Sequence, residues 1–194
     1  LLEQIKGFGN PLLVITGGDP MMRPDLVEFI AYGSELGLRV SLAPSATKLV
    51  TTKRLQAAKE AGLARVSMSL DGPTAKVHDA FRQTPGSFQR TLEVVDHLRE
   101  AGVSLQINST VSRYNVDCLA ALAEKVADLG ALMWSVFFLV PTGRGKADDM
   151  ISPEAHEAVF NWLYDLSQTA PYDVKTTAAE HYRRGQELYA LGEY

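Results

Sequence analysis

The segment Thr16-Gly17-Gly18-Asp19-Pro20 carries residue types that suit the binding of a charged ligand. It comes after the apolar run Leu12–Ile15 and precedes a helical pattern that starts near Arg23. The two glycines lack a Cβ, so another molecule can approach their backbone closely. The carboxylate of Asp19 can meet an ammonium group beside exposed backbone carbonyls, and Pro20 ends the strand. The same pattern also fits a tight turn that binds no ligand.

Other predicted strands also end in distinctive polar residues. These ends are Pro44–Thr47, Ser69–Pro73, Asn108–Thr110, Pro141–Gly145 and Lys175–Thr177. In parallel α/β folds, ligands bind at the edge formed by the carboxyl ends of the strands. We therefore expect a binding site along this edge, although ordinary turns use similar residues.

Several cationic and metal-ligating residues are candidates for roles in the site. Gly143-Arg144-Gly145 could hold a carboxylate or phosphate with a two-pronged guanidinium, or form an exposed loop. His78 and Arg82 are four residues apart, which places them on one face of a predicted helix. The four histidines do not have metal-ligand spacing, and the single cysteine, Cys118, cannot hold an iron–sulfur cluster or structural zinc. We therefore predict no metal site built from these residues.

The elements that position these residues alternate between strands and amphipathic helices. Glycines 37, 62, 102 and 130 are expected to cap helices just before the predicted strands Leu38–Leu42, Arg65–Leu70, Val103–Asn108 and Leu132–Phe138. The predicted helices are Pro24–Leu36, Thr52–Ala61, Phe88–Ala101, Val116–Leu129 and Pro153–Ser167, with a strand, Tyr172–Thr176, and a helix from about Ala178 after them. Such alternation predicts a parallel sheet, either a (β/α) barrel or an open doubly wound sheet. Without a linker, residues 1–194 are treated as one domain.

Bulk properties narrow the classes of function. The chain has 194 residues, is 46% hydrophobic and carries a net charge of −4, without a basic cluster, so we expect no nucleic-acid partner. No apolar run approaches the roughly 18 residues that a membrane helix needs. A single cysteine indicates a reducing compartment, and we expect a cytoplasmic protein. The opening segment, Leu1–Lys6, is typical of the end of a helix and has no initiator Met, so we expect a preceding segment.

Taken together, these segments resemble the radical S-adenosylmethionine (radical SAM) superfamily. Gly17-Gly18-Asp19-Pro20 is similar to the family's Gly-Gly-Glu-Pro motif, with aspartate in place of glutamate. Val66–Pro73 and His78–Arg82 look like the family's fourth strand and the segment after it. Asn108–Val111 and Val140–Gly145 look like the fifth and sixth strand ends. The resemblance covers nearly the whole chain and implies a partial (β/α) TIM-like barrel with its first strand missing.

The sequence departs from the family in one important respect. The family binds a [4Fe-4S] cluster through a Cys-x-x-x-Cys-x-x-Cys loop after its first strand, and that loop is absent here. We expect the loop upstream of Leu1, so that this chain alone is inactive and the full-length protein is a radical SAM enzyme. The segment Lys175–Arg184 is similar to the haem-related branch, whose members carry a C-terminal auxiliary-cluster region.

The resemblance also implies cofactors and residue roles. The enzyme would cleave S-adenosylmethionine (SAM) reductively to a 5′-deoxyadenosyl radical that removes hydrogen from a substrate, in peptide or haem maturation. The implied SAM-binding residues are Gly17, Gly18, Asp19, Ser69, Arg82, Asn108, Val140 and Pro141. The first three would meet the methionyl ammonium, and Arg82 would meet the carboxylate. Ser69 would lie near the methionine or ribose, Asn108 near the ribose, and Val140 and Pro141 would flank the adenine.

Partners and alternatives complete the expectations. We expect a small-molecule or peptide substrate, an electron donor such as flavodoxin or ferredoxin, and self-association through the sheet edge exposed by a missing strand. One alternative is a Schiff-base aldolase that uses Lys175 as its nucleophile. Another is a non-catalytic binding domain with a degenerate radical SAM fold.

Overall fold

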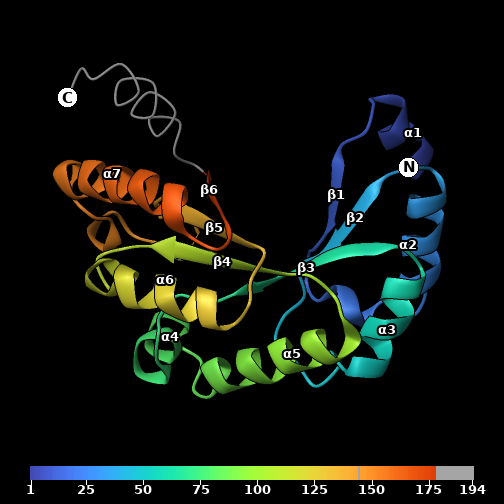
Figure 1. Ribbon diagram of the computed structural model, residues 1–194, viewed down its shortest axis with the longest axis horizontal. Coiled ribbons are helices and arrows are strands. Elements are labelled where there is room, and N and C mark those ends of the chain that lie inside the picture. Colours follow the sequence, from blue (N-terminus) through green and yellow to red (C-terminus); the bar gives the residue numbers. More distant parts are fainter. Residues whose placement is uncertain (144, 178–194) are drawn as a thin grey trace. The chain divides into compact units, whose positions relative to one another are not determined.

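The fold is an α/β arrangement of six strands in chain order. The computed structural model describes residues 1–143 and 145–177, so the helix predicted from Ala178, His181 and Arg144 lie outside the described residues. The strands form one sheet in the order β1-β2-β3-β4-β5-β6, with helices in the connections (Figure 1). This sequential order is that of a partial (β/α) barrel, because a doubly wound sheet would reverse its order part-way. The predicted parallel α/β class is therefore confirmed.

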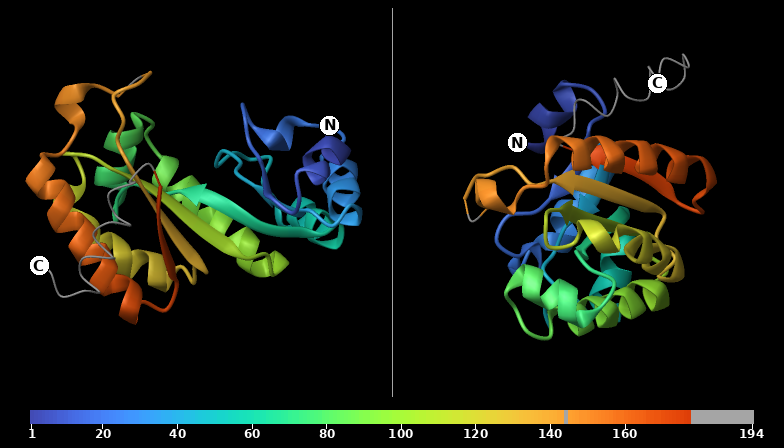
Figure 2. Two further views of the ribbon diagram at one scale, coloured as in Figure 1. Left: turned by 90° about the horizontal axis from the view of Figure 1, so that it is seen from above. Right: turned by 90° about the vertical axis from the view of Figure 1, so that its left-hand side faces the viewer.

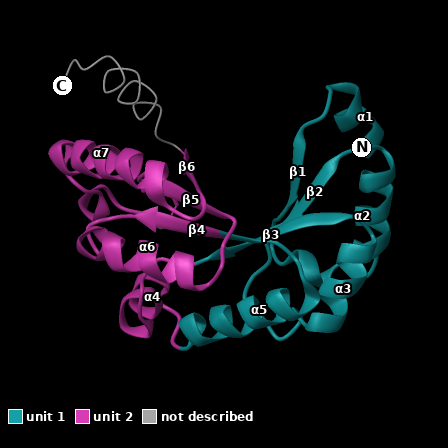
Figure 3. Ribbon diagram, in the orientation of Figure 1, with its two compact units in different colours: residues 1–69, 86–106 teal, residues 70–85, 107–194 magenta. Residues whose placement is uncertain are grey.

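The chain divides into two compact units, coloured separately in Figure 3. The first unit comprises residues 1–69 and 86–106. Its elements are α1 (Leu2–Gly7), β1 (Leu12–Ile15), the 3-10 helix η1 (Pro20–Met22), α2 (Leu26–Glu35), β2 (Arg39–Leu42), α3 (Thr52–Glu60), β3 (Leu63–Ser69) and α5 (Ser87–Ala101). Strand β1 pairs in parallel with β2, and β2 with β3. Helices α2, α3 and α5 cover one face of these strands (Figures 1 and 2).

The second unit comprises residues 70–85 and 107–194. Its elements are α4 (Ala75–Arg82), most of β4 (Leu105–Val111), η2 (Val116–Cys118), α6 (Leu119–Asp128), β5 (Met133–Phe138), η3 (Ala147–Asp149), α7 (Pro153–Thr169) and β6 (Asp173–Thr177). Strands β5 and β6 pair in parallel. Helix α7 begins as predicted, with Pro153 in its first turn and the Ser152 Oγ accepting the amide of Ala155 at 3.2 Å. Within the described ranges, no helix is long and apolar enough to cross a membrane.

Strands β2 and β3 alternate apolar residues with polar ones, and β5 carries one polar residue among apolar ones. Along β5, Trp134, Val136 and Phe138 are buried, and Ser135 lies between them in the alternation. In β2 and β3, Ser41 is in register with Arg65, and both are buried. Polar side chains therefore occur within the strands as well as at their ends.

Three boundaries differ from the sequence-based expectations. Strand β4 continues to Val111, so Asn108 lies within the strand and not at its end. Asn108 and Thr110 alternate with buried residues, which is the pattern of a strand with one face buried. Cys118 ends η2 and precedes α6, whereas the predicted helix Val116–Leu129 included it. Lys175 lies in the middle of β6 and is exposed, so the nucleophile of the aldolase alternative is not at a strand end as that alternative requires.

An aromatic cluster anchors the second unit. Trp134 is fully buried, and its ring makes edge contacts with Trp162 and Tyr172 at centroid distances of 6.1 and 6.3 Å. Its indole Nε1 donates to the Ser109 Oγ at 2.8 Å. The Tyr172 hydroxyl donates to the Ala123 carbonyl at 3.0 Å, and burial raises the pKa of Tyr172 to about 12. The cluster thus joins β5, α7 and β4 through both packing and hydrogen bonds.

We predict that Trp134→Leu lowers the free energy of unfolding by about 2 kcal/mol, because it leaves a cavity and removes the hydrogen bond that the indole donates to the Ser109 Oγ. Urea denaturation followed by circular dichroism measures this change. The nearby Leu132→Ala is the matched control, since Leu132 is 55% exposed and should cost no more than about 0.5 kcal/mol. Equal losses for the two variants would contradict the proposed anchoring.

Candidate functional site

The Gly17-Gly18-Asp19 turn comes directly after β1 and leaves its backbone open. Gly17 has φ of +116°, a conformation that residues with a side chain rarely adopt, and Gly18 is next to it. A Cβ built on either glycine meets no atom within 4 Å, and both residues are exposed. The backbone of the turn is therefore sterically open to another molecule.

Asp19 has a structural role as well as a free charge. Its Oδ1 accepts the amide of Met21 at 3.1 Å, which caps η1, and its Oδ2 accepts the Thr47 hydroxyl at 3.1 Å. The Arg54 guanidinium donates to the carbonyls of Met21 at 2.7 Å and Leu49 at 3.2 Å. The turn after β1 is thus tied to the segment after β2. Each Asp19 oxygen retains a lone pair for a further donor.

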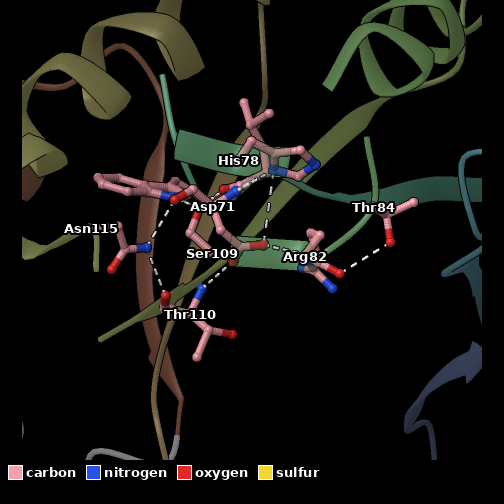
Figure 4. Close-up of polar contacts among 9 residues, drawn as sticks. Asp71, His78, Arg82, Thr84, Ser109, Thr110 and Asn115 are labelled. Atoms are coloured by element: carbon pink, nitrogen blue, oxygen red, sulfur yellow. Dashed lines mark hydrogen bonds and ion pairs between the residues drawn. The ribbon is translucent and has the colours of Figure 1, made fainter. Parts of the chain in front are cut away.

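A second polar cluster in the other unit is organised by Asp71, which is fully buried just after β3 (Figure 4). Its Oδ2 accepts from the Arg82 Nε at 2.5 Å, and its Oδ1 accepts the amide of Thr110 at 2.8 Å. Its backbone amide donates to the His78 Nδ1 at 3.0 Å, and its carbonyl accepts from the Asn115 Nδ2 at 2.9 Å. His78 and Arg82 therefore do share a face of α4, and that face contacts Asp71.

The surroundings of His78 define its protonation. Its side chain is buried, and Nδ1 accepts a hydrogen bond, so the ring proton of the neutral form sits on Nε2. Burial lowers the pKa of His78, outweighing the opposing effect of Asp71 at 4.0 Å. The imidazole is therefore a neutral acceptor that fixes the turn at Asp71.

Hydrogen bonds between side chains and backbone extend the Asp71 cluster to the residues after β4. Asn115 also donates to the Thr110 carbonyl at 2.9 Å, and its Oδ1 accepts the amide of Ser112 at 2.9 Å. The Ser109 hydroxyl donates to the Leu70 carbonyl at 2.5 Å. Gly72 has no space for a side chain, because a Cβ there would lie 2.6 Å from Val77. These contacts hold α4 and the segment after β4 in one arrangement.

Arg82 lines a cavity of about 680 Å³ within the second unit. One wall comes from α4 and includes Val77 and Phe81, and another comes from Thr110 and Ser112 after β4. A third wall is formed after β5 and includes Leu139, Gly145, Lys146 and Asp149. Because the Arg82 Nε is bound to Asp71, its remaining guanidinium nitrogens are the ones available to an anion in the cavity.

The predicted site residues occupy distinct places. Gly17, Gly18 and Asp19 form the turn after β1, and Ser69 is the last residue of β3. Arg82 lines the cavity, Asn108 lies two residues before the cavity residue Thr110, and the exposed pair Val140 and Pro141 comes after the cavity residue Leu139. The assignment of these residues to SAM stays a prediction.

Local sequence patterns do not identify the residues that position these groups. Thr47 stands out in the sequence only as one of several polar residues after a strand, and no motif marks Arg54 or Asn115. The hydrogen bonds that tie them to Asp19, Met21 and Asp71 join residues 28 to 44 positions apart in sequence, so local spacing carries no signal for these contacts.

Six strands in sequential order, joined through helices, define a protein of the α/β partial-barrel class. The profile of the radical SAM superfamily matches residues 1–126. The chain belongs to the radical SAM superfamily.

Individual relatives agree with this membership. The chain is 43% identical over 186 residues to the AdoMet-dependent heme synthase of Nitratidesulfovibrio vulgaris, covering 95% of this chain and 50% of that protein. The heme synthase of Methanosarcina barkeri is 41% identical over 94% of this chain and 52% of its own length. The chain therefore spans about half the length of these curated relatives. The crystal structure of Streptococcus suis SuiB bound to its precursor peptide SuiA matches with a TM-score of 0.71 at 19% identity, covering 96% of this chain and 43% of SuiB.

We predict that His78 makes stability fall at acid pH. Because its folded-state pKa lies below 6.5, the unfolded chain takes up the proton first, and stability is lost as the pH falls below 6.5. In His78→Gln this contribution is absent, so the stability advantage of the wild type should shrink between neutral pH and pH 5. Urea titrations at several pH values measure it, with His97→Gln as the control, because His97 lies on α5 with its side chain 40% exposed. Parallel pH profiles for wild type and His78→Gln would refute the prediction.

Proposed function

We propose that this chain is part of the core domain of a radical SAM oxidoreductase that acts in tetrapyrrole or haem maturation. The observation that carries the proposal is the 43% identity with a heme synthase across 95% of the chain. The open glycine turn and the anchored arginine support it, since a zwitterionic amino acid needs an acid and a cation. When bound, SAM and a [4Fe-4S] cluster supply the reductive cleavage that starts hydrogen abstraction.

The residues of the β1 turn would bind the ammonium of SAM. The free backbone of Gly17 and Gly18 and the spare lone pairs of Asp19 fit an ammonium donor. We assign the methionyl carboxylate to Arg82, whose Nε is already fixed by Asp71. Ser69 and Asn108 would serve the methionine or ribose, and the exposed apolar residues Val140 and Pro141 the adenine.

The residues of this chain cannot supply the ligands of a [4Fe-4S] cluster. The sequence has one cysteine, and among the described residues no group of His, Cys, Asp or Glu could hold a metal ion. We therefore propose that the cluster ligands belong to a part of the protein outside these 194 residues, and that this chain alone is inactive. A full-length sequence without a three-cysteine loop would favour the degenerate binding domain instead.

A peptide substrate is the second candidate, because SuiB was crystallised with a precursor peptide on the same fold. Full-length protein with a reconstituted cluster, supplied with SAM and a reductant, tests the enzyme proposal. Liquid chromatography should detect methionine and 5′-deoxyadenosine in equal amounts, and their absence would overturn the proposal. Added porphyrin or peptide then shows which substrate is consumed.

Two further proposals concern partners and location. The reaction consumes electrons, so we propose a small reducing protein such as flavodoxin or ferredoxin as the donor. We also propose a cytoplasmic location, which the single cysteine supports because oxidising compartments favour paired cysteines. Reduction of the cluster by purified flavodoxin, monitored by absorbance, tests the first point. Fractionation of cells tests the second.

We predict that Asp19→Asn weakens SAM binding about tenfold without changing the fold, because the amide keeps an acceptor for the cap but loses the charge. Calorimetric titration of the full-length protein measures the dissociation constant, and urea denaturation checks stability. Asp25→Asn is the control, since Asp25 is an exposed carboxylate just beyond the same turn. An unchanged SAM affinity in Asp19→Asn would remove Asp19 from the site.

We predict that the 194-residue chain self-associates through β1. This strand pairs with β2 and stands at the end of the sheet order, and its Leu12 and Val14 are 44% and 43% exposed. Light scattering should show a molar mass that rises with concentration, and Val14→Lys should reduce that rise because a charge on an edge strand opposes pairing. A monomer at every concentration would contradict the prediction.

A further inference from the structure

The cavity of the second unit combines an apolar wall with cationic groups. Helix α4 contributes Val77, Ala80 and Phe81 to its lining, and Leu139 adds a further apolar side chain. Lys76 lies on the same helix, and Lys146 lies on the segment before η3. The cavity therefore presents ammonium groups beside an apolar surface, which suits a ligand that carries both kinds of group.

The charges of this lining are unbalanced in favour of the cations. Arg82 is paired through its Nε with Asp71, which is buried behind it. Asp149, the acidic residue of the lining, accepts the Tyr114 hydroxyl at 2.6 Å and lies 3.6 Å from the Arg113 guanidinium. That hydroxyl is the main reason why the pKa of Asp149 is lowered, and the backbone amide of Lys146 and the charges of Arg113 and Lys146 add to the effect, so Asp149 stays ionised.

Neither lysine forms an ion pair within residues 1–143 and 145–177. The pairs found there join other cations to their acids, and none involves Lys76 or Lys146. Both residues are exposed, so their ammonium groups are hydrated and can exchange water for an anionic ligand at small cost.

We propose that Lys76 and Lys146 bind the carboxylate side chains of an apolar macrocyclic substrate whose ring lies against the α4 wall of the cavity. The inference rests on the proposed function in haem maturation and adds the residues that would select the substrate. A carboxylated porphyrin has both chemical features of the lining, a flat apolar ring and flexible anionic arms. A peptide has no such fixed combination, because its charges depend on its sequence.

The roles of the lysines and of Arg82 are separate in this arrangement. Arg82 is held by a hydrogen bond at 2.5 Å to a buried carboxylate, so its orientation is fixed. The lysines are long, flexible point charges that can reach carboxylates at different positions on a ring. Removing the lysines should therefore weaken substrate binding without affecting SAM.

Porphyrin binding by the full-length protein tests this inference. The probes are coproporphyrin III and its tetramethyl ester, measured by absorbance titration in the same detergent buffer. The double variant Lys76→Gln/Lys146→Gln should bind coproporphyrin roughly fivefold more weakly, as two exposed ion pairs would contribute. Its affinity for the ester should not change, and the difference between the two proteins should vanish at high salt. Lys76→Arg/Lys146→Arg should restore binding, and Lys53→Gln, an exposed lysine on α3, is the matched control.

The outcomes separate this inference from the proposed function. SAM cleavage and porphyrin binding by wild type, with unchanged affinity in the double glutamine variant, would overturn the lysine assignment and leave the function standing. Failure of wild type to bind either porphyrin, with SAM cleavage intact, would also overturn the assignment and favour a peptide substrate. Failure of wild type to cleave SAM at all would overturn the proposed function itself.

Discussion

The buried carboxylate of Asp71 is the constraint on which the second unit depends. A charge without solvent is costly unless hydrogen bonds satisfy it, and removing one partner leaves that cost exposed. Here Arg82 and the Thr110 amide satisfy the carboxylate, while His78 and Asn115 satisfy the backbone of the same residue. Helix α4 and the segment after β4 must therefore stay in place together. The same bonds that stabilise the unit also fix the edge of a guanidinium at the cavity.

The carboxylate in the turn after β1 is hydrogen-bonded in a similar way but is less buried. Asp19 also accepts one backbone amide and one side-chain donor, from Met21 and Thr47. It is only half-buried, however, so its charge remains within reach of a ligand. The Asp71 carboxylate is fully buried and instead positions the Arg82 guanidinium. The difference in burial therefore leaves the Asp19 carboxylate accessible and limits Asp71 to positioning other residues.

The order of elements and the parallel class could be predicted from the sequence, because glycine caps and helical periodicity are local signals. Gly37, Gly62, Gly102 and Gly130 end their helices with φ between 64° and 100°, as expected. The predicted end of β4 was wrong, because the strand continues through Asn108 and Thr110, whose polar side chains alternate with buried ones. The turn could be predicted as a candidate site, whereas Thr47, Arg54 and Asn115 could not, since their partners are distant in sequence and no local pattern encodes them.

The distribution of charge gives the two candidate subsites different chemistry. The β1 turn offers a carboxylate and open carbonyls, which favour a cation such as an amino-acid ammonium. The cavity offers Lys76, Lys146 and a fixed Arg82, with its one acid already paired to Tyr114, which favours anions. An overall charge of −4 conceals this local excess of positive charge. Because each subsite opposes the charge preferred by the other, a misplaced carboxylate is repelled at Asp19 and a misplaced amine at the lysines. Opposite charges at the two proposed subsites would favour ligand groups of opposite charge.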